Sequence, residues 1–218
     1  MRARILKASI EVTDRLAELG LHHGLFVTGI KAGEVARATC TRNDPSNAGG
    51  TLAFFRTIRS LRESLIPKGW QAIEPNGLPL VANLNGGIAI AISTGDQGTG
   101  FPDREVKTKY SKGDATQAVL DEGREYQLAL DLGPIAYRTR FPKKETPRFA
   151  TWYLLRHRVK NVVHFEFSLP VEIGSKGRIS VWKERLFFPS IAIEPVLDDL
   201  EAQNDDTVEE IDVAVERI

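Results

Sequence analysis

The sequence is nearly without cysteine. Cys40 is the only one in 218 residues, which excludes an intrachain disulfide, the usual multi-cysteine zinc sites and a Cys-x-x-Cys redox pair. No apolar run approaches the roughly 20 residues that cross a bilayer. The first ten residues lack the apolar stretch of a signal peptide, because Arg2, Arg4 and Lys7 interrupt it. We therefore expect a cytoplasmic protein without membrane contact.

The motifs of common cofactor and catalytic sites are absent as well. Gly95, Gly98 and Gly100 are followed neither by a predicted helix nor by the Lys-Ser/Thr pair of a phosphate loop, and no Gly-x-Ser-x-Gly elbow occurs. Glycine amides can form an anion-binding nest, but a mobile hairpin extension is the simpler interpretation of this loop. We expect no cofactor, and a non-enzymatic function is favoured over an enzyme.

The net charge of zero conceals an uneven distribution. Residues 194–218 contain ten acids and one base. Removing them from the totals of 29 each leaves 28 basic and 19 acidic residues in 1–193, an excess of about nine positive charges. A basic body with an acidic tail indicates a surface for nucleic acid or an acidic protein, although a solubilising tail explains the same numbers.

Apolar residues at helical spacing predict three helices. The first covers residues 3–19 and ends at Gly20. The second and clearest covers Thr51–Leu65, and the third covers Thr116–Tyr126. The first two are amphipathic, so each is expected to pack one face on a sheet.

Short runs of β-branched and alternating residues predict the strands. Leu25–Val27 and Glu34–Cys40 indicate an edge pair, and Leu78–Leu84 with Ile88–Ser93 indicate a hairpin around Asn85-Gly86-Gly87. The C-terminal part predicts a three-stranded antiparallel meander over Thr151–Arg158, Val162–Leu169 and Arg178–Phe188. Residues 94–116 and 133–148 are predicted to be a polar loop and an extended connector.

Together these patterns predict an α+β fold. Two amphipathic N-terminal helices pack on a largely antiparallel sheet that ends in the three-stranded meander. Residues 1–193 form a single domain, and residues 194–218 form an acidic tail with an apolar C-terminal segment.

Basic residues concentrate on one predicted helix and one predicted loop. A solvated helix face explains the helix arginines equally well, but contacts to a DNA or RNA backbone, or to an acidic protein, need such clusters. Aromatic residues in basic loops can stack on bases, and Trp70, Phe101 and Tyr110 are candidates. The predicted binding residues are Arg56, Arg59, Arg62, Lys107, Lys109 and Lys112.

The four histidines predict no metal site. His22 and His23 are adjacent and therefore point in different directions. A three-residue turn at 159–161 places His157 on the apolar face and His164 on the polar face of the meander. A two-histidine site needs another register.

A catalytic cluster is a weaker prediction. The polar face of the meander carries acid, base and cation together, which suits a nucleotide- or phosphodiester-processing enzyme, but cross-strand charge pairing explains the same residues. The residues concerned are Glu166, His164 and Glu184, with Arg156 and Lys183 beside them.

The C-terminal segment suggests a second class of function. Val208, Ile211, Val215 and Ile218 form a helical stripe, and Ile211, Val213 and Val215 alternate as in an added strand. The alternative function is therefore an interaction or assembly subunit that forms a homo-oligomer or a hetero-complex through this tail.

A set of motifs adds a resemblance. The chain resembles a group of uncharacterised bacterial proteins found on plasmids, integrative elements and prophages, over about residues 48–190. The resemblance implies a non-enzymatic accessory role in a mobile genetic element or in phage defence, and it assigns no chemistry. The motifs are Gly95-Asp96, Gly98-Thr99-Gly100, Lys109, Lys112-Gly113, Thr116-Gln117, Thr151-Trp152, Phe165, Ser168-Leu169-Pro170, Trp182 and Glu184-Arg185.

Overall fold

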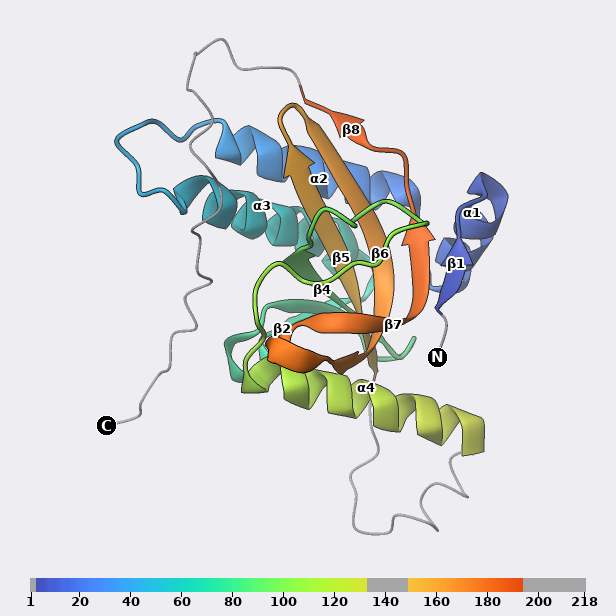
Figure 1. Ribbon diagram of the computed structural model, residues 1–218. Coiled ribbons are helices and arrows are strands. Elements are labelled where there is room, and N and C mark those ends of the chain that lie inside the picture. The colour runs from blue at the N-terminus through green and yellow to red at the C-terminus, as the bar shows by residue number, and fades with distance from the viewer. Residues whose placement is uncertain (1–2, 133–148, 194–218) are drawn as a thin grey trace, which may run out of the picture.

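The computed structural model describes residues 3–132 and 149–193, which fold as helices on both faces of one mixed sheet (Figure 1). The helices in this part of the chain are α1 (Ser9–Glu18), α2 (His23–Arg37), α3 (Ala48–Leu65) and α4 (Asp114–Leu132). Its strands are β1 (Arg4–Leu6), β2 (Gln71–Ile73), β3 (Leu80–Asn83), β4 (Ile88–Thr94), β5 (Ala150–Val159), β6 (Val162–Ile173), β7 (Ile179–Phe187) and β8 (Ile191–Ala192).

The strand order confirms a largely antiparallel sheet. The strands follow one another as β1-β7-β6-β5-β4-β3-β2, and β8 pairs with β6. The predicted hairpin forms β3 and β4, and the predicted meander forms β5, β6 and β7. Two neighbouring pairs are parallel, β4 with β5 and β1 with β7. The α+β fold expected from the sequence is therefore confirmed.

The sheet separates two hydrophobic cores. Helices α1, α2 and α3 cover one face, where Phe26 and Leu61 are buried. Helix α4 covers part of the other face and contributes Val119 to the second core. Successive residues of β5 alternate between the cores, with Leu154 in the first and Leu155 in the second. The sheet is thus buried on both faces at its centre.

Residues 23–37 form a single helix, so the prediction of two short strands at Leu25–Val27 and Glu34–Cys40 is wrong. Gly29 and Gly33 of this helix lie at the contact between α2 and α3. A Cβ on Gly33 would lie only 2.6 Å from the Ala53 carbonyl oxygen, and one on Gly29 would lie 3.3 Å from Leu61. Glycine therefore permits the close approach of the two helices.

The ends of the other helices differ from the predictions in detail. Residues 4–6, expected in the first helix, instead form β1 beside β7, and the helix begins at Ser9. Gly20 follows this helix with a φ of 71°, as expected of a glycine stop. Helix α3 matches the helix predicted at Thr51–Leu65 closely. Helix α4 is longer than the helix predicted at Thr116–Tyr126, because it extends to Leu132. The predicted connector 133–148 and the tail 194–218 lie outside the described residues.

Over residues 3–132 and 149–193, the structure contains no helix that is both long enough and apolar enough to span a bilayer.

Candidate nucleic-acid interface

The arginines of α3 are largely engaged in ion pairs. Arg59 lies 2.7 Å from Glu63, and Arg62 lies 3.0 Å from Glu74. Arg62 also donates hydrogen bonds to the carbonyls of Ile73 and Leu80, which tie α3 to the sheet edge. Of the three α3 arginines predicted to bind, only Arg56 has no acid partner among the described residues. This stripe is therefore mostly neutralised.

The loop between β4 and α4 is fixed to the sheet rather than extended away from it. Gly95 and Thr108 form a β-bridge, and the Lys109 amide donates to the Thr94 carbonyl at 2.9 Å. Val106 is buried in the second core, where its carbonyl accepts a hydrogen bond from the Trp182 indole at 2.9 Å. Figure 1 shows this loop crossing in front of β5 and β6, with α2 and α3 behind them.

The glycines of this loop serve internal packing. The amide of Gly98 donates to the Asp96 carboxylate at 3.0 Å, and the amide of Gly100 donates to Glu166 at 2.9 Å. A Cβ on Gly98 would collide with the Glu105 carbonyl. These two amides therefore point to protein acceptors, and the loop does not present them as a nest for phosphate.

Two turns that are distant in sequence meet and bring cations together. The Lys112 amide donates to the Gly177 carbonyl at 2.7 Å, and the Thr108 amide donates to the Ile179 carbonyl at 3.0 Å. The loop lysines thereby lie beside the basic turn that connects β6 and β7. We call the resulting group the loop–turn cluster; it consists of Lys107, Lys109, Lys112, Lys176 and Arg178.

Three members of the loop–turn cluster are exposed and form no ion pair. No carboxylate of the described residues lies within 4 Å of Lys107, Lys176 or Arg178. Lys176 and Arg178 were not among the predicted binding residues, because only the folded meander brings their turn to the loop. The available signal was the pair of basic residues, Lys176 and Arg178, at the turn between the two predicted strands.

Aromatic rings accompany the cations on this side. The Lys109 ammonium lies 5.5 Å from the centroid of the half-buried Tyr110 ring. Phe101 lies between the Arg104 guanidinium and His164, with centroid distances of 4.4 and 4.7 Å. Trp70 is buried in the first core with 5% of its surface exposed. Its prediction as a stacking residue is wrong, because a buried ring cannot stack on a base.

The two predicted basic regions occupy opposite faces of the sheet. Helix α3 packs in the first core, whereas the loop packs in the second through Val106. A ligand that binds one region directly therefore does not reach the other along a flat surface.

The histidines of the meander lie in a register that differs from the prediction. The turn contains two residues, Lys160 and Asn161, so Val159 pairs with Val162 and His157 pairs directly with His164. The two imidazoles therefore belong to the same face, and the prediction of opposite faces is wrong. The structure shows no group of three or more His, Cys, Asp or Glu residues suited to a metal within 3–132 and 149–193.

His157 is a half-buried side chain whose surroundings favour the neutral imidazole. Its Nδ1 lies 3.2 Å from the Gly95 carbonyl oxygen, which can only accept, so Nδ1 carries the hydrogen. Burial lowers the pKa of His157 and outweighs the opposing effects of Gly95 and Asp96. The folded protein thus resists protonation at this position more strongly than the unfolded chain does.

The stability of the protein should consequently decrease at mildly acidic pH. The unfolded chain takes up a proton on His157 at a higher pH than the folded protein does, so the free energy of unfolding falls as pH drops below about 6.5. Urea titrations between about pH 7.5 and 5.5 measure this fall. His23, whose pKa burial also lowers, acts in the same direction, so His157→Gln should weaken the pH dependence without abolishing it. An unchanged pH dependence in that variant would contradict the assignment.

The three catalytic candidates are not brought to one site. Glu166 is fully buried and accepts from Arg185 at 2.9 and 2.7 Å and from Ser168 at 2.8 Å. Glu184 lies on the other face of the sheet, where Arg15 donates to both of its carboxylate oxygens at 3.0 Å. His164 is half-buried, and its ring packs against the ring of Phe101. Both carboxylates therefore hold structural ion pairs.

The remaining cations of the predicted polar cluster are divided in the same way. Arg156 lies on the face covered by α2 and α3, where it donates to Glu34 at 3.2 Å and to the Gly50 carbonyl at 3.2 Å. Lys183 lies on the opposite face and donates to Gln127 of α4. The structure thus distributes the predicted cluster over both faces of the sheet.

The predicted partner-binding residues of the tail, Val208, Ile211, Val215 and Ile218, lie outside the described residues. No protein-family model, curated protein or solved structure matches this chain.

Proposed function

We propose that this protein binds the phosphate backbone of single-stranded nucleic acid through the loop–turn cluster. The observation that carries the proposal is the meeting of two basic turns, fixed by the Lys112–Gly177 and Thr108–Ile179 backbone hydrogen bonds. Cations held in place before binding lose less conformational freedom when a ligand arrives. The cluster is thus prepared to contact several phosphates at once.

The contrast between the two basic regions supports this choice of surface. Arg59 and Arg62 of α3 already have acid partners, whereas Lys107, Lys176 and Arg178 have none among the described residues. An ion-paired arginine must give up its carboxylate or share it before it can neutralise a phosphate. The loop–turn cluster therefore gains more from a polyanion than the α3 stripe does.

The aromatic residues favour a single strand over a duplex. Tyr110 and Phe101 lie on the same loop as the lysines and are partly exposed. Unpaired bases can stack on such rings, whereas bases inside a duplex are already stacked. An accessory role of this binding in a mobile genetic element or in phage defence is part of the proposal and is based on the sequence resemblance.

A charge-matched pair of variants tests the proposal. The first replaces Lys107, Lys176 and Arg178 by alanine; the second replaces Arg56, Arg59 and Lys68, three exposed cations of α3 and the turn after it. Both lose three positive charges, and the second keeps the Arg62 tether. Affinity for a labelled oligo(dT) strand is measured by fluorescence anisotropy at about 50 mM salt.

The first variant should bind roughly 500-fold more weakly than the wild type, because it loses three phosphate contacts. Each phosphate contact on a single strand contributes about −0.7 to the slope of log K against log salt. One contact therefore raises the affinity by nearly a factor of ten when the salt concentration falls from 1 M to 50 mM. The second variant should lose less than about threefold in affinity, because its three cations act on the strand only through screened long-range electrostatics. Equal losses in both would contradict the assigned surface. Binding of poly-glutamate in preference to DNA would instead support an acidic protein partner.

A further inference from the structure

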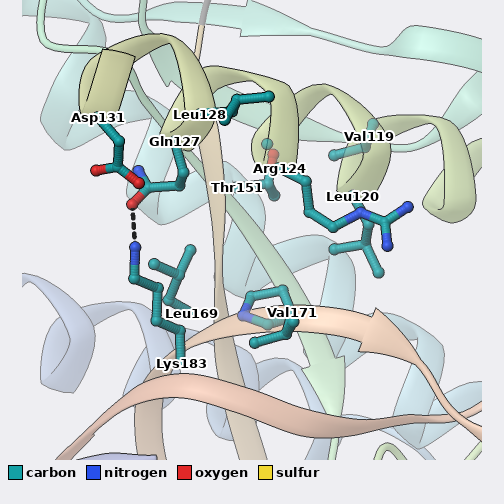
Figure 2. Close-up of a pocket in the computed structure, with 12 residues that line it drawn as sticks. Val119, Leu120, Arg124, Gln127, Leu128, Asp131, Thr151, Leu169, Val171 and Lys183 are labelled. Carbon is teal, nitrogen blue, oxygen red and sulfur yellow. Dashed lines mark hydrogen bonds between the residues drawn. The ribbon is translucent and has the colours of Figure 1, made fainter. Parts of the chain in front are cut away.

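A pocket lies between α4 and the sheet. It is on the side of the molecule away from α2 and α3 (Figure 1). Its volume is about 240 Å³, and its walls come from α4, β5, β6 and β7. Figure 2 shows Leu120 of the helix extending towards the sheet, and Leu128, Leu169 and Val171 also line the pocket. Pockets for drug-sized ligands measure about 300–1,000 Å³, so this one suits a smaller molecule.

Irregular strand pairing shapes the floor of this pocket. Leu169 pairs with Glu184 and Pro170 pairs with Trp182, which leaves Lys183 as an extra residue in β7. Such bulges redirect side chains out of the regular alternation. Lys183 consequently extends towards α4, where its ammonium donates to the Gln127 side-chain oxygen (Figure 2).

The pocket wall contains a buried hydroxyl that no other described residue satisfies. Thr151 of β5 is 2% exposed, and its Oγ1 forms no hydrogen bond with any residue of 3–132 and 149–193. A buried polar group without a partner destabilises the folded protein relative to one that is hydrogen-bonded. A ligand atom that accepts from or donates to this hydroxyl would remove that cost.

We propose that this pocket binds a small monocarboxylate with an apolar body. The carboxylate accepts hydrogen bonds from the Lys183 ammonium and the Gln127 amide, and the apolar body lies between Leu128 and Leu169. A polar atom within the ligand satisfies Thr151. The pocket is independent of the loop–turn cluster, so this inference does not depend on nucleic-acid binding.

The other charged residues of the pocket wall are consistent with a ligand that carries a single negative charge. Arg124 pairs with Asp121 on the same helix, and its charge is therefore neutralised. Asp131 lies near the Lys183 end of the pocket (Figure 2). It has no ion pair among the described residues, so it opposes an incoming carboxylate. Its removal should consequently strengthen binding.

Ligand titrations followed by methyl chemical shifts test the site in the full chain. The probes are phenylacetate, 3-phenylpropanoate and octanoate, each compared with its primary amide. We expect saturable shifts at the Leu128 and Leu169 methyls with the acids. The amides should bind at least about fivefold more weakly, because they lack the charge that pairs with Lys183. No saturable shift at these methyls, or equal binding of acids and amides, would overturn the proposal.

Three conservative variants distinguish the site from a packing defect. Lys183→Met should weaken the carboxylates at least about fivefold, and Asp131→Asn should strengthen them about two- to threefold. Thr151→Val keeps the side-chain shape, so it should raise the melting temperature of the ligand-free protein and weaken 4-hydroxyphenylacetate or another probe with an internal polar atom. Unchanged affinities in Lys183→Met and Asp131→Asn, both at exposed positions, would refute the proposal.

Discussion

Glu166→Ala is expected to lower the free energy of unfolding by about 3–5 kcal/mol, the largest effect of any single substitution considered for this protein. Glu166 is fully buried and receives hydrogen bonds from Arg185, Ser168 and Gly100. Its removal leaves the guanidinium of Arg185, which is 4% exposed, without a counter-charge. Urea or guanidinium titrations at neutral pH measure the loss.

An exposed ion pair provides the control for this substitution. Arg59→Ala breaks the pair with Glu63 and should cost at most about 1 kcal/mol, because both side chains are more than half exposed. Replacing both buried partners, as in Glu166→Leu with Arg185→Met, should recover much of the stability that Glu166→Ala loses. A cost below about 1 kcal/mol for Glu166→Ala would contradict the anchoring role.

The Glu166 network also connects stability with the proposed interface. The Gly100 amide donates to Glu166, and the Arg104 carbonyl accepts from Arg185 at 2.8 Å. The buried pair therefore holds the loop that carries Lys107 and Lys109. A loosened loop would make the loop–turn cluster less organised before binding.

Gly33→Ala should destabilise the protein by about 2–3 kcal/mol, because overpacking at a fixed contact forces the backbone to shift. The added Cβ would meet the Ala53 carbonyl oxygen at 2.6 Å and the Thr57 hydroxyl. The Ala53 carbonyl belongs to the backbone of α3, so relief requires the two helices to separate. The measurement is the denaturant midpoint, at constant m-value.

Gly123→Ala is the matched comparison for Gly33→Ala. Gly123 also lies inside a helix, but its added Cβ would be 3.6 Å from the nearest atoms of Ala150 and Thr151, an ordinary contact. Alanine should therefore stabilise α4 by about 0.5–1 kcal/mol through helix propensity. Equal effects of the two substitutions would show that α2 and α3 do not pack as closely as described.

The comparison of sequence and structure shows which features depend on local pattern. The helix at Thr51–Leu65 and the hairpin around Asn85-Gly86-Gly87 were predicted because their apolar spacing and turn residues act within a few positions. Helix α2 was missed because Gly29 and Gly33 have low helix propensity. These glycines permit the close contact between α2 and α3, and this non-local role cannot be predicted from local sequence patterns.

The candidate site depends on non-local contacts to a greater degree. The loop lysines were recognised from composition, but the approach of Lys176 and Arg178 results from pairing between distant segments. The histidine pair was misplaced because a turn one residue shorter inverts the faces. The pocket under α4 could not be predicted, since Lys183 is redirected by a bulge whose position the sequence does not mark.

The salt dependence of oligo(dT) binding tests the central claim most directly. With five cations of the loop–turn cluster on phosphates, log K should fall against log salt with a slope of about −3.5, which is roughly a 100-fold loss between 50 and 200 mM. The Lys107, Lys176 and Arg178 triple alanine variant should reduce the slope to about −1.4, because two contacts remain. A slope near zero for the wild type, or one that this variant leaves unchanged, would contradict the account.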